Sequence, residues 1–143
     1  YLKIAFPREE VDIDSLATQT FPAKDIQYWK DCFHWFLQAI TLCENKPLVL
    51  KSPTHTGRLG MLSELYPDAR FIHLSRHPYS LIPSTIKLWQ SLSQVQGLQA
   101  TSDPAKDEDF VFACFERMYQ GYEHGLEAVP NSRLIEVSYE KLT

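Results

Sequence analysis

Two segments of the chain share one local pattern, an apolar run that ends in a basic residue and is followed two residues later by a proline. The first is LVLKSPTH at 48–55 and the second is IHLSRHPYS at 72–80. A short apolar run bounded by turn residues is typical of a buried strand, and proline suits the first turn of a helix because its missing N–H needs no partner there. Each copy therefore predicts a strand that leads into a helix, and strands alternating with helices predict a parallel sheet with right-handed crossovers.

The rest of the chain fits this arrangement. Between residues 23 and 44, apolar residues from Ile26 to Cys43 recur three or four positions apart, which predicts an amphipathic helix. We expect strands at 48–51, 70–75 and 133–138, helices at 23–44, 52–66, 78–93 and 104–129, an entry loop at 1–22 and a polar loop at 93–103. The expected fold class is α/β, with about three parallel strands and flanking helices. Because no linker divides the chain, we expect a single partial domain over residues 1–143.

Composition excludes several classes of function. The net charge of −4 argues against a nucleic-acid-binding protein, so any anion site must be local. The three cysteines lack the spacing of a metal site, and we expect buried free thiols and no metal. No apolar run reaches the ~18–20 residues that cross a bilayer, so we expect no membrane segment.

Free thiols and the absence of a visible signal peptide favour the cytoplasm. The sequence starts without methionine and stops as a new element begins, which suggests a piece of a longer chain.

Basic residues follow two of the expected strands where ligands bind to open parallel sheets. Lys51 and Arg76 both fall at the carboxyl ends of strands, beside helix N-termini whose N–H groups favour anions. Arg76 offers a planar fork for phosphate oxygens, and Ser84 lies about six residues into the next helix, roughly 9 Å along its axis. The two side chains could converge on one phosphate. The simpler interpretation is a solvated charge and an unrelated helical serine.

The stretch from 48 to 84, LVLKSPTHTGRLGMLSELYPDARFIHLSRHPYSLIPS, resembles the central block of the sulfotransferase family, in particular its bacterial-type branch. VSYEKL at 137–142 is similar to the family's Tyr-Glu-x-Leu segment. The family moves a sulfuryl group from 3′-phosphoadenosine 5′-phosphosulfate (PAPS) to a hydroxyl or amine. The resemblance implies a P-loop-NTPase-like sulfotransferase fold, of which this chain would be the central and C-terminal part.

The resemblance also implies roles for residues that match the family's motifs. Arg76 and Ser84 match the pair that binds the donor's 3′-phosphate, and Tyr139 falls where the family has a residue near the adenine. His77 departs from the acidic or amide residue common in relatives, and would either touch the phosphate or cap the helix. Nothing resembles the family's loop for the 5′-phosphosulfate, which we expect upstream of Tyr1. We therefore expect the isolated chain to bind the donor weakly and to be inactive.

Lys51 and His55 are the candidate catalytic residues. Sulfuryl transfer, like phosphoryl transfer, needs positioning, charge stabilisation and a base for the acceptor's proton. We expect His55 to be the base and Lys51 to stabilise the transferred group. Better-known family members place the histidine two residues after the lysine, whereas here the separation is four. An upstream Glu or Asp is therefore an alternative base, and a helix-start hydrogen bond is an alternative role for His55.

The sequence also suggests alternative roles for two further side chains and alternative functions for the chain. Arg58 would face either donor or solvent, and Trp89 with the loop that follows would border the acceptor. The acceptor itself would be a small molecule, a carbohydrate or a peptide. The alternatives to a sulfotransferase are a nucleotide-dependent kinase-like α/β protein and a noncatalytic binding module of the same fold.

Overall fold

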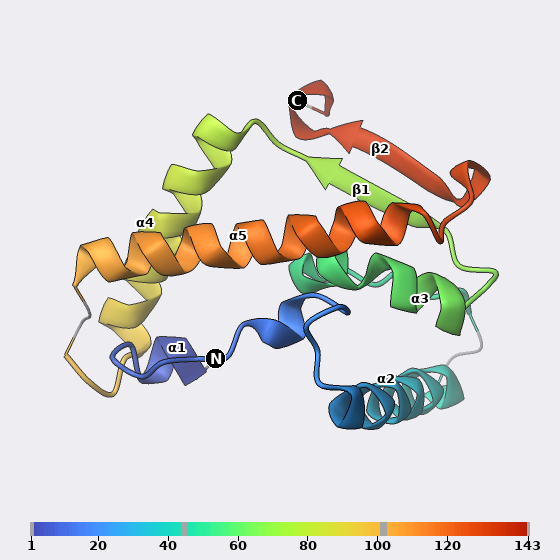
Figure 1. Cartoon of the computed structure of the whole chain (residues 1–143), viewed down its shortest axis with the longest axis horizontal. Coiled ribbons are helices and arrows are strands. Elements are labelled where there is room, and N and C mark those ends of the chain that lie inside the picture. The colour runs from blue at the N-terminus through green and yellow to red at the C-terminus, as the bar shows by residue number, and fades with distance from the viewer. Residues whose placement is uncertain (1, 44–45, 101–102, 143) are drawn as a thin grey trace. The chain divides into compact units, whose positions relative to one another are not determined.

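A computed structural model describes residues 2–43, 46–100 and 103–142 (Figure 1). Its elements in chain order are α1 (Leu2–Ala5), the 3-10 helix η1 (Asp14–Leu16), α2 (Ala23–Cys43), η2 (Pro53–Arg58), α3 (Leu59–Leu65), β1 (Phe71–Ser75), α4 (Pro78–Gln96), α5 (Pro104–Leu126), η3 (Asn131–Arg133), β2 (Leu134–Ser138) and η4 (Tyr139–Lys141). The chain divides into two compact units. The first comprises the residues up to Ile13, Arg70–Arg117 and the residues from Asn131 on, and the second comprises Asp14–Ala69 and Met118–Pro130. Whether they make one domain stays a prediction.

The first unit is built on a parallel pair of strands. β1 and β2 run side by side in register from Phe71 opposite Leu134 to Ser75 opposite Ser138 (Figure 1). His73 and its register partner Glu136 form a side-chain hydrogen bond, with 3.1 Å between Nδ1 and Oε1. The parallel pairing confirms the α/β class. Because parallel strands end at the same edge, the residues after β1 and after β2 meet there.

Helix α4 begins at Pro78, where the sequence predicts it. Pro83 does not end the helix, which continues to Gln96 and so takes in the first residues of the expected polar loop. A hydrogen bond of 2.7 Å from Leu98 N–H to Ala5 O joins the N-terminal segment to the residues just after this helix. Within the same unit, Trp89 of α4 meets the ring of Phe110 on α5 edge to face, with 5.3 Å between centroids. This contact makes Trp89 a packing residue of the first unit.

The second unit is held by close contact between η2 and the C-terminal part of α5. A Cβ added to Gly121 would lie 2.5 Å from the carbonyl oxygen of Gly57 and 2.9 Å from the Cβ of Ala17. Only a residue without a side chain lets two backbones approach this closely. Around this contact lie buried apolar side chains, those of Ala17, Leu59, Met61, Leu62, Tyr122 and Val129.

Residues 48–51, the third expected strand, do not form a strand in the structure. The segment is irregular, and Val49 is 97% exposed. A strand needs a neighbour to pair its backbone groups, and in the described part of the chain only β1 and β2 pair. The expected helix 52–66 is also different, since η2 precedes a short α3.

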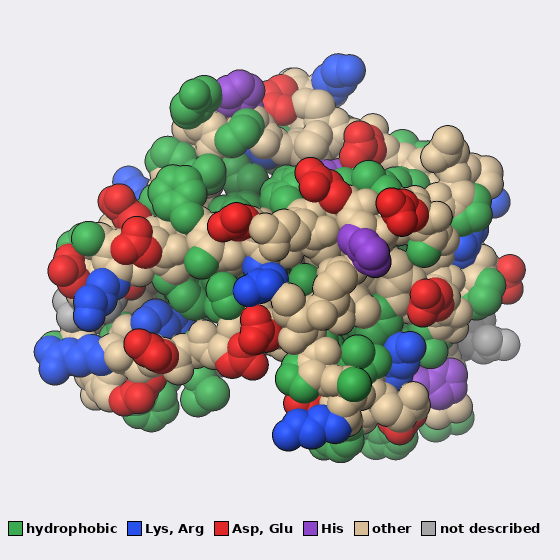
Figure 2. Space-filling model, in the orientation of Figure 1, with side chains coloured by type: hydrophobic (Ala, Val, Ile, Leu, Met, Phe, Trp, Pro, Cys, Tyr) green, Lys and Arg blue, Asp and Glu red, His purple; other side chains and the backbone are tan. Residues whose placement is uncertain are grey.

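Helix α2 leaves much of its apolar surface open, and Figure 2 shows apolar side chains exposed along it. Its predicted stripe is half-buried at Trp29 and Phe33, but Phe36 is 49% exposed. Tyr28 and Trp35, outside the stripe, are 73% and 69% exposed. The described residues therefore cover only part of this amphipathic helix.

Candidate active site

Arg76 and Tyr139 meet at the carboxyl edge of the parallel pair. Arg76 directly follows β1 and Tyr139 directly follows β2, whose last residues Ser75 and Ser138 are register partners. The guanidinium carbon of Arg76 lies 5.1 Å from the centroid of the Tyr139 ring, within the range of a cation–π contact. Two residues that the family resemblance assigns to one donor therefore lie together, although 63 positions separate them.

Glu140 ties the turn after β2 to the start of α4. Its Oε1 accepts a hydrogen bond of 2.9 Å from the backbone N–H of His77, and its Oε2 accepts one from the Ser138 hydroxyl. The His77 N–H, and then the Ser138 hydroxyl, lower the pKa of the Glu140 carboxyl to about 2. The sequence interpretation missed this residue. The available signal was an acid just after a strand, at an edge where a helix N-terminus was also expected.

The N-terminus of α4 is less available to an anion than the sequence suggests. The His77 N–H donates to Glu140, Pro78 has no N–H, and the N–H groups of Ser80 and Leu81 both donate to His77 O. His77 stands at the N-cap position without a side-chain cap, and its ring stacks on Tyr79. Of the backbone N–H groups at the start of α4, those of His77, Ser80 and Leu81 therefore already have acceptors.

Ser84 is an exposed residue in the second turn of α4. Ser84 lies seven positions, or about two helical turns, after the N-cap residue His77. The two residues are therefore on the same face of the helix, roughly 10 Å apart along its axis. Arg76 and Ser84 belong to the same unit. Their joint contact with a phosphate stays a prediction.

His55 belongs to the second unit, in η2. Its backbone N–H donates to Ser52 O at 3.2 Å, and its ring meets the rings of Phe33 and Trp29 edge to face at 5.4 and 6.4 Å. Its Nδ1 is buried and has no hydrogen-bond partner among the described residues. Burial, and then the charge of Arg58, lower the pKa of His55. The imidazole is therefore neutral near pH 7, which is the form that a general base requires.

Lys51 is an exposed residue of the irregular segment before η2. The Ser52 side chain that follows does not cap η2, and its hydroxyl is 3.0 Å from that of Thr54. Lys51 and His55 lie in the same unit. A shared action on the transferred group stays a prediction.

Arg58 is buried and does not face solvent, contrary to one of the two expectations, and its contact with the donor stays a prediction. It is 9% exposed, and its Nε and Nη2 donate to the carbonyl oxygen of Ser15 at 3.0 and 2.6 Å. The guanidinium also lies 5.0 Å from the Trp29 ring and 5.9 Å from the Phe21 ring. Burial lowers its pKa. Nothing in the sequence distinguishes this arginine from an exposed one, because its partner is a backbone carbonyl 43 residues away.

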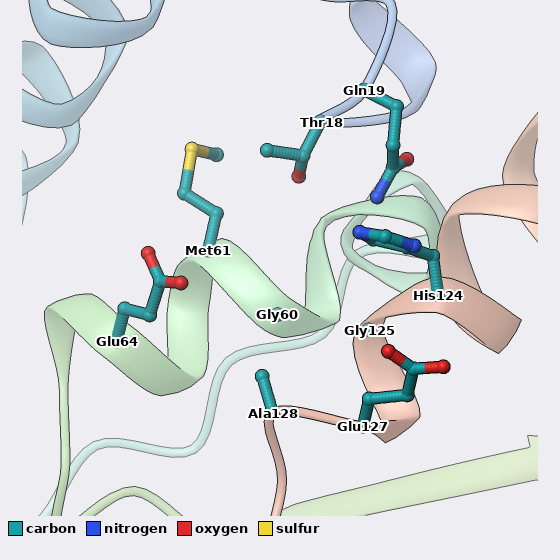
Figure 3. Close-up of a pocket in the computed structure, with 9 residues that line it drawn as sticks. All are labelled: Thr18, Gln19, Gly60, Met61, Glu64, His124, Gly125, Glu127 and Ala128. Carbon is teal, nitrogen blue, oxygen red and sulfur yellow. The ribbon is translucent and has the colours of Figure 1, made fainter.

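A pocket of about 430 Å³ lies elsewhere in the second unit, between α3, the end of α5 and the segment before α2 (Figure 3). It is lined by Thr18, Gln19, Gly60, Met61, Glu64, His124, Gly125, Glu127 and Ala128. No candidate residue from the sequence lines it, and its described lining contains two carboxylates but no lysine or arginine. This composition does not suit a phosphate or a sulfate.

Metal-ligating side chains do not cluster in the described ranges 2–43, 46–100 and 103–142. The cysteines are free, although Cys32 and Cys43 are exposed and only Cys114 is partly buried, contrary to the expectation of buried thiols. Burial raises the pKa of Cys114 to about 11. No helix among the described residues is long and apolar enough to cross a membrane.

Comparison with known proteins gives the chain a family. Residues 3–143 match the profile of the sulfotransferase family. The chain is 34% identical over 148 aligned positions to omega-hydroxy-beta-dihydromenaquinone-9 sulfotransferase Stf3 of Mycobacterium bovis, and equally to Stf3 of Mycobacterium tuberculosis. Each alignment covers 99% of this chain but 37% of the relative, so the chain spans little more than a third of their length. No solved structure matches significantly. The chain belongs to the sulfotransferase family.

Proposed function

We propose that the protein carrying this chain is a sulfotransferase that moves a sulfuryl group from PAPS to a hydroxyl or amine, and that this segment supplies the 3′-phosphate site. The observation that carries the proposal is the contact of Arg76 with Tyr139 at the carboxyl edge of the strands. An arginine fork for a phosphate beside an aromatic ring for a base is the composition that a phosphorylated adenosine requires. The proposed fold of the whole domain is the P-loop-like fold of the family.

In the proposed complex each residue of the first unit has one role. Arg76 pairs with two oxygens of the 3′-phosphate, Ser84 donates its hydroxyl to the same group, and Tyr139 lies against the adenine. These contacts hold the donor so that the sulfur lies in line between the leaving oxygen and the acceptor oxygen. The bond from sulfur to the donor's phosphate oxygen breaks as the bond to the acceptor oxygen forms, and the acceptor's proton passes to a base.

His55 is the proposed base and Lys51 the proposed stabiliser of the charge on the transferred group. The neutral state of His55 supports the assignment, since only an unprotonated ring takes a proton. The packing of its ring against Phe33 and Trp29 supports the alternative, in which His55 is structural and an upstream carboxylate is the base. His55→Ala in the full-length protein tests this: loss of transfer with intact donor binding supports the base, and unchanged transfer rejects it.

A lipid-like small molecule with a hydroxyl group is the acceptor class that we propose ahead of carbohydrate or peptide. The support is the name of the relatives, which describes a hydroxylated dihydromenaquinone as their acceptor. We also propose that the protein acts in the cytoplasm and that the isolated chain does not turn over. Sulfation by the 143-residue chain alone would contradict the last proposal.

Donor competition tests the proposed function against its rivals. Adenosine 3′,5′-bisphosphate should displace a bound fluorescent nucleotide from the full-length protein far better than ATP or ADP. Stronger displacement by ATP would favour a kinase-like protein. Binding of the bisphosphate without transfer to any hydroxyl or amine acceptor would favour a noncatalytic module.

A further inference from the structure

Glu140 joins the two chain segments that meet at the carboxyl edge of the strands, the one after β1 and the one after β2. One carboxylate oxygen accepts from the His77 N–H, between Arg76 and α4, and the other accepts from Ser138 at the end of β2. Arg76 and Tyr139 are the residues immediately before His77 and Glu140 respectively. The carboxylate therefore bridges the backbones that carry the two members of the Arg76–Tyr139 contact.

These hydrogen bonds are of a strong kind. Hydrogen bonds to an ionised carboxylate are shorter and stronger than those between neutral groups. The low pKa of Glu140, about 2, has the same origin, and the carboxyl group is ionised at neutral pH.

The negative charge of Glu140 has two opposite effects on phosphate binding at this edge. A negative charge next to Arg76 repels an incoming phosphate, so Glu140 by itself would weaken anion binding. It also takes up the N–H of His77, a donor that a phosphate would otherwise use. Its presence is useful to a phosphate site only if the order that it imposes on Arg76 outweighs this repulsion.

We propose that Glu140 is a positioning residue, whose bridge between His77 and Ser138 holds Arg76 and Tyr139 in the arrangement that receives the donor's 3′-phosphate and adenine. The proposal rests on the proposed function. Glu140 touches neither the phosphate nor the reacting atoms, and acts through Arg76. An arginine fixed before the ligand arrives loses less side-chain freedom on binding.

The test is calorimetric titration of the full-length protein with adenosine 3′,5′-bisphosphate and with adenosine 5′-monophosphate, which lacks the 3′-phosphate. We expect Glu140→Ala to weaken bisphosphate binding about tenfold, as for the loss of one charge-assisted contact, and to reduce the preference over the monophosphate. Glu140→Gln keeps one acceptor oxygen and should lose less. Glu108→Gln, at an exposed position of α5 in the same unit, removes the same charge and should change neither constant.

A double-mutant cycle separates positioning from a general structural role. If Glu140 acts through Arg76, then Glu140→Ala weakens bisphosphate binding less in an Arg76→Ala background than in the unmodified protein. Equal losses in both backgrounds would overturn the proposal, and so would unchanged or tighter bisphosphate binding by both Glu140 variants. Failure of the unmodified protein to bind the bisphosphate would instead overturn the proposed function. Binding that depends on Arg76 but not on Glu140 would overturn this inference alone.

Discussion

Substitution of Arg58 tests whether this arginine stabilises the fold or binds the donor. Its guanidinium donates twice to Ser15 O and lies over the Trp29 ring. Arg58→Ala removes charge-assisted hydrogen bonds worth about 1.5–3 kcal/mol and a cation–π contact worth about 0.5–2 kcal/mol. It also removes the cost of burying the charge, so we expect a net destabilisation of about 2–4 kcal/mol. Arg58→Lys keeps a charge but not the fork, and should cost about 1–2 kcal/mol.

Urea unfolding of the full-length protein, followed by tryptophan fluorescence, measures these changes. Lys24→Ala, at an exposed position of α2, is the control and should change stability by less than about 0.5 kcal/mol. The binding constant for adenosine 3′,5′-bisphosphate, measured where each variant is folded, should stay within about threefold of the unmodified value, a change of less than one kcal/mol. Unchanged stability together with lost bisphosphate binding would refute this reasoning, and would return Arg58 to the donor site.

Three further predictions follow from the packing and the pKa shifts. Gly121→Ala should destabilise the protein by about 1–3 kcal/mol in urea, despite a gain in helix propensity, because the new Cβ meets Gly57 O at 2.5 Å; an unchanged midpoint would contradict this contact. His55 resists protonation when folded, so stability should fall as pH drops below 6.5, where the unfolded chain takes up the proton first; His55→Gln should flatten this slope in pH-dependent urea midpoints. The Glu140 carboxylate should contribute stability above pH 4.5 that is lost as pH falls to about 2, and a Glu140→Gln variant with an equal acid slope would argue against its hydrogen bonds.

The elements that the sequence predicts well are those whose signals are local. Pro78 marks the start of α4, and the spacing from Ile26 to Cys43 predicts α2, because turn chemistry and helical periodicity depend on neighbours along the chain. The strand expected at 48–51 is wrong for the opposite reason. An apolar run becomes a strand only where another strand pairs with it, and Val49 has no such neighbour in the described chain.

In the candidate site too, the sequence predicts some contacts and misses those that depend on distant backbone groups. The family resemblance assigns Arg76 and Tyr139 to one ligand, and they do lie together, because both follow parallel strands at one edge. Glu140 was missed because one of its two partners is a backbone N–H 63 positions away, and a backbone donor leaves no signature in the sequence. The burial of Arg58 was missed for the same reason.

The most direct test of the 3′-phosphate site is the preference of the full-length protein for adenosine 3′,5′-bisphosphate over adenosine 5′-monophosphate, measured before and after Arg76→Ala and Ser84→Ala. We predict a clear preference in the unmodified protein. Arg76→Ala should weaken bisphosphate binding by about 30-fold or more, as for the loss of a charged hydrogen-bonded partner, and Ser84→Ala by about tenfold, while monophosphate binding changes little. An unmodified protein that does not distinguish the two nucleotides, or an Arg76→Ala variant that keeps the full preference, would contradict the assignment.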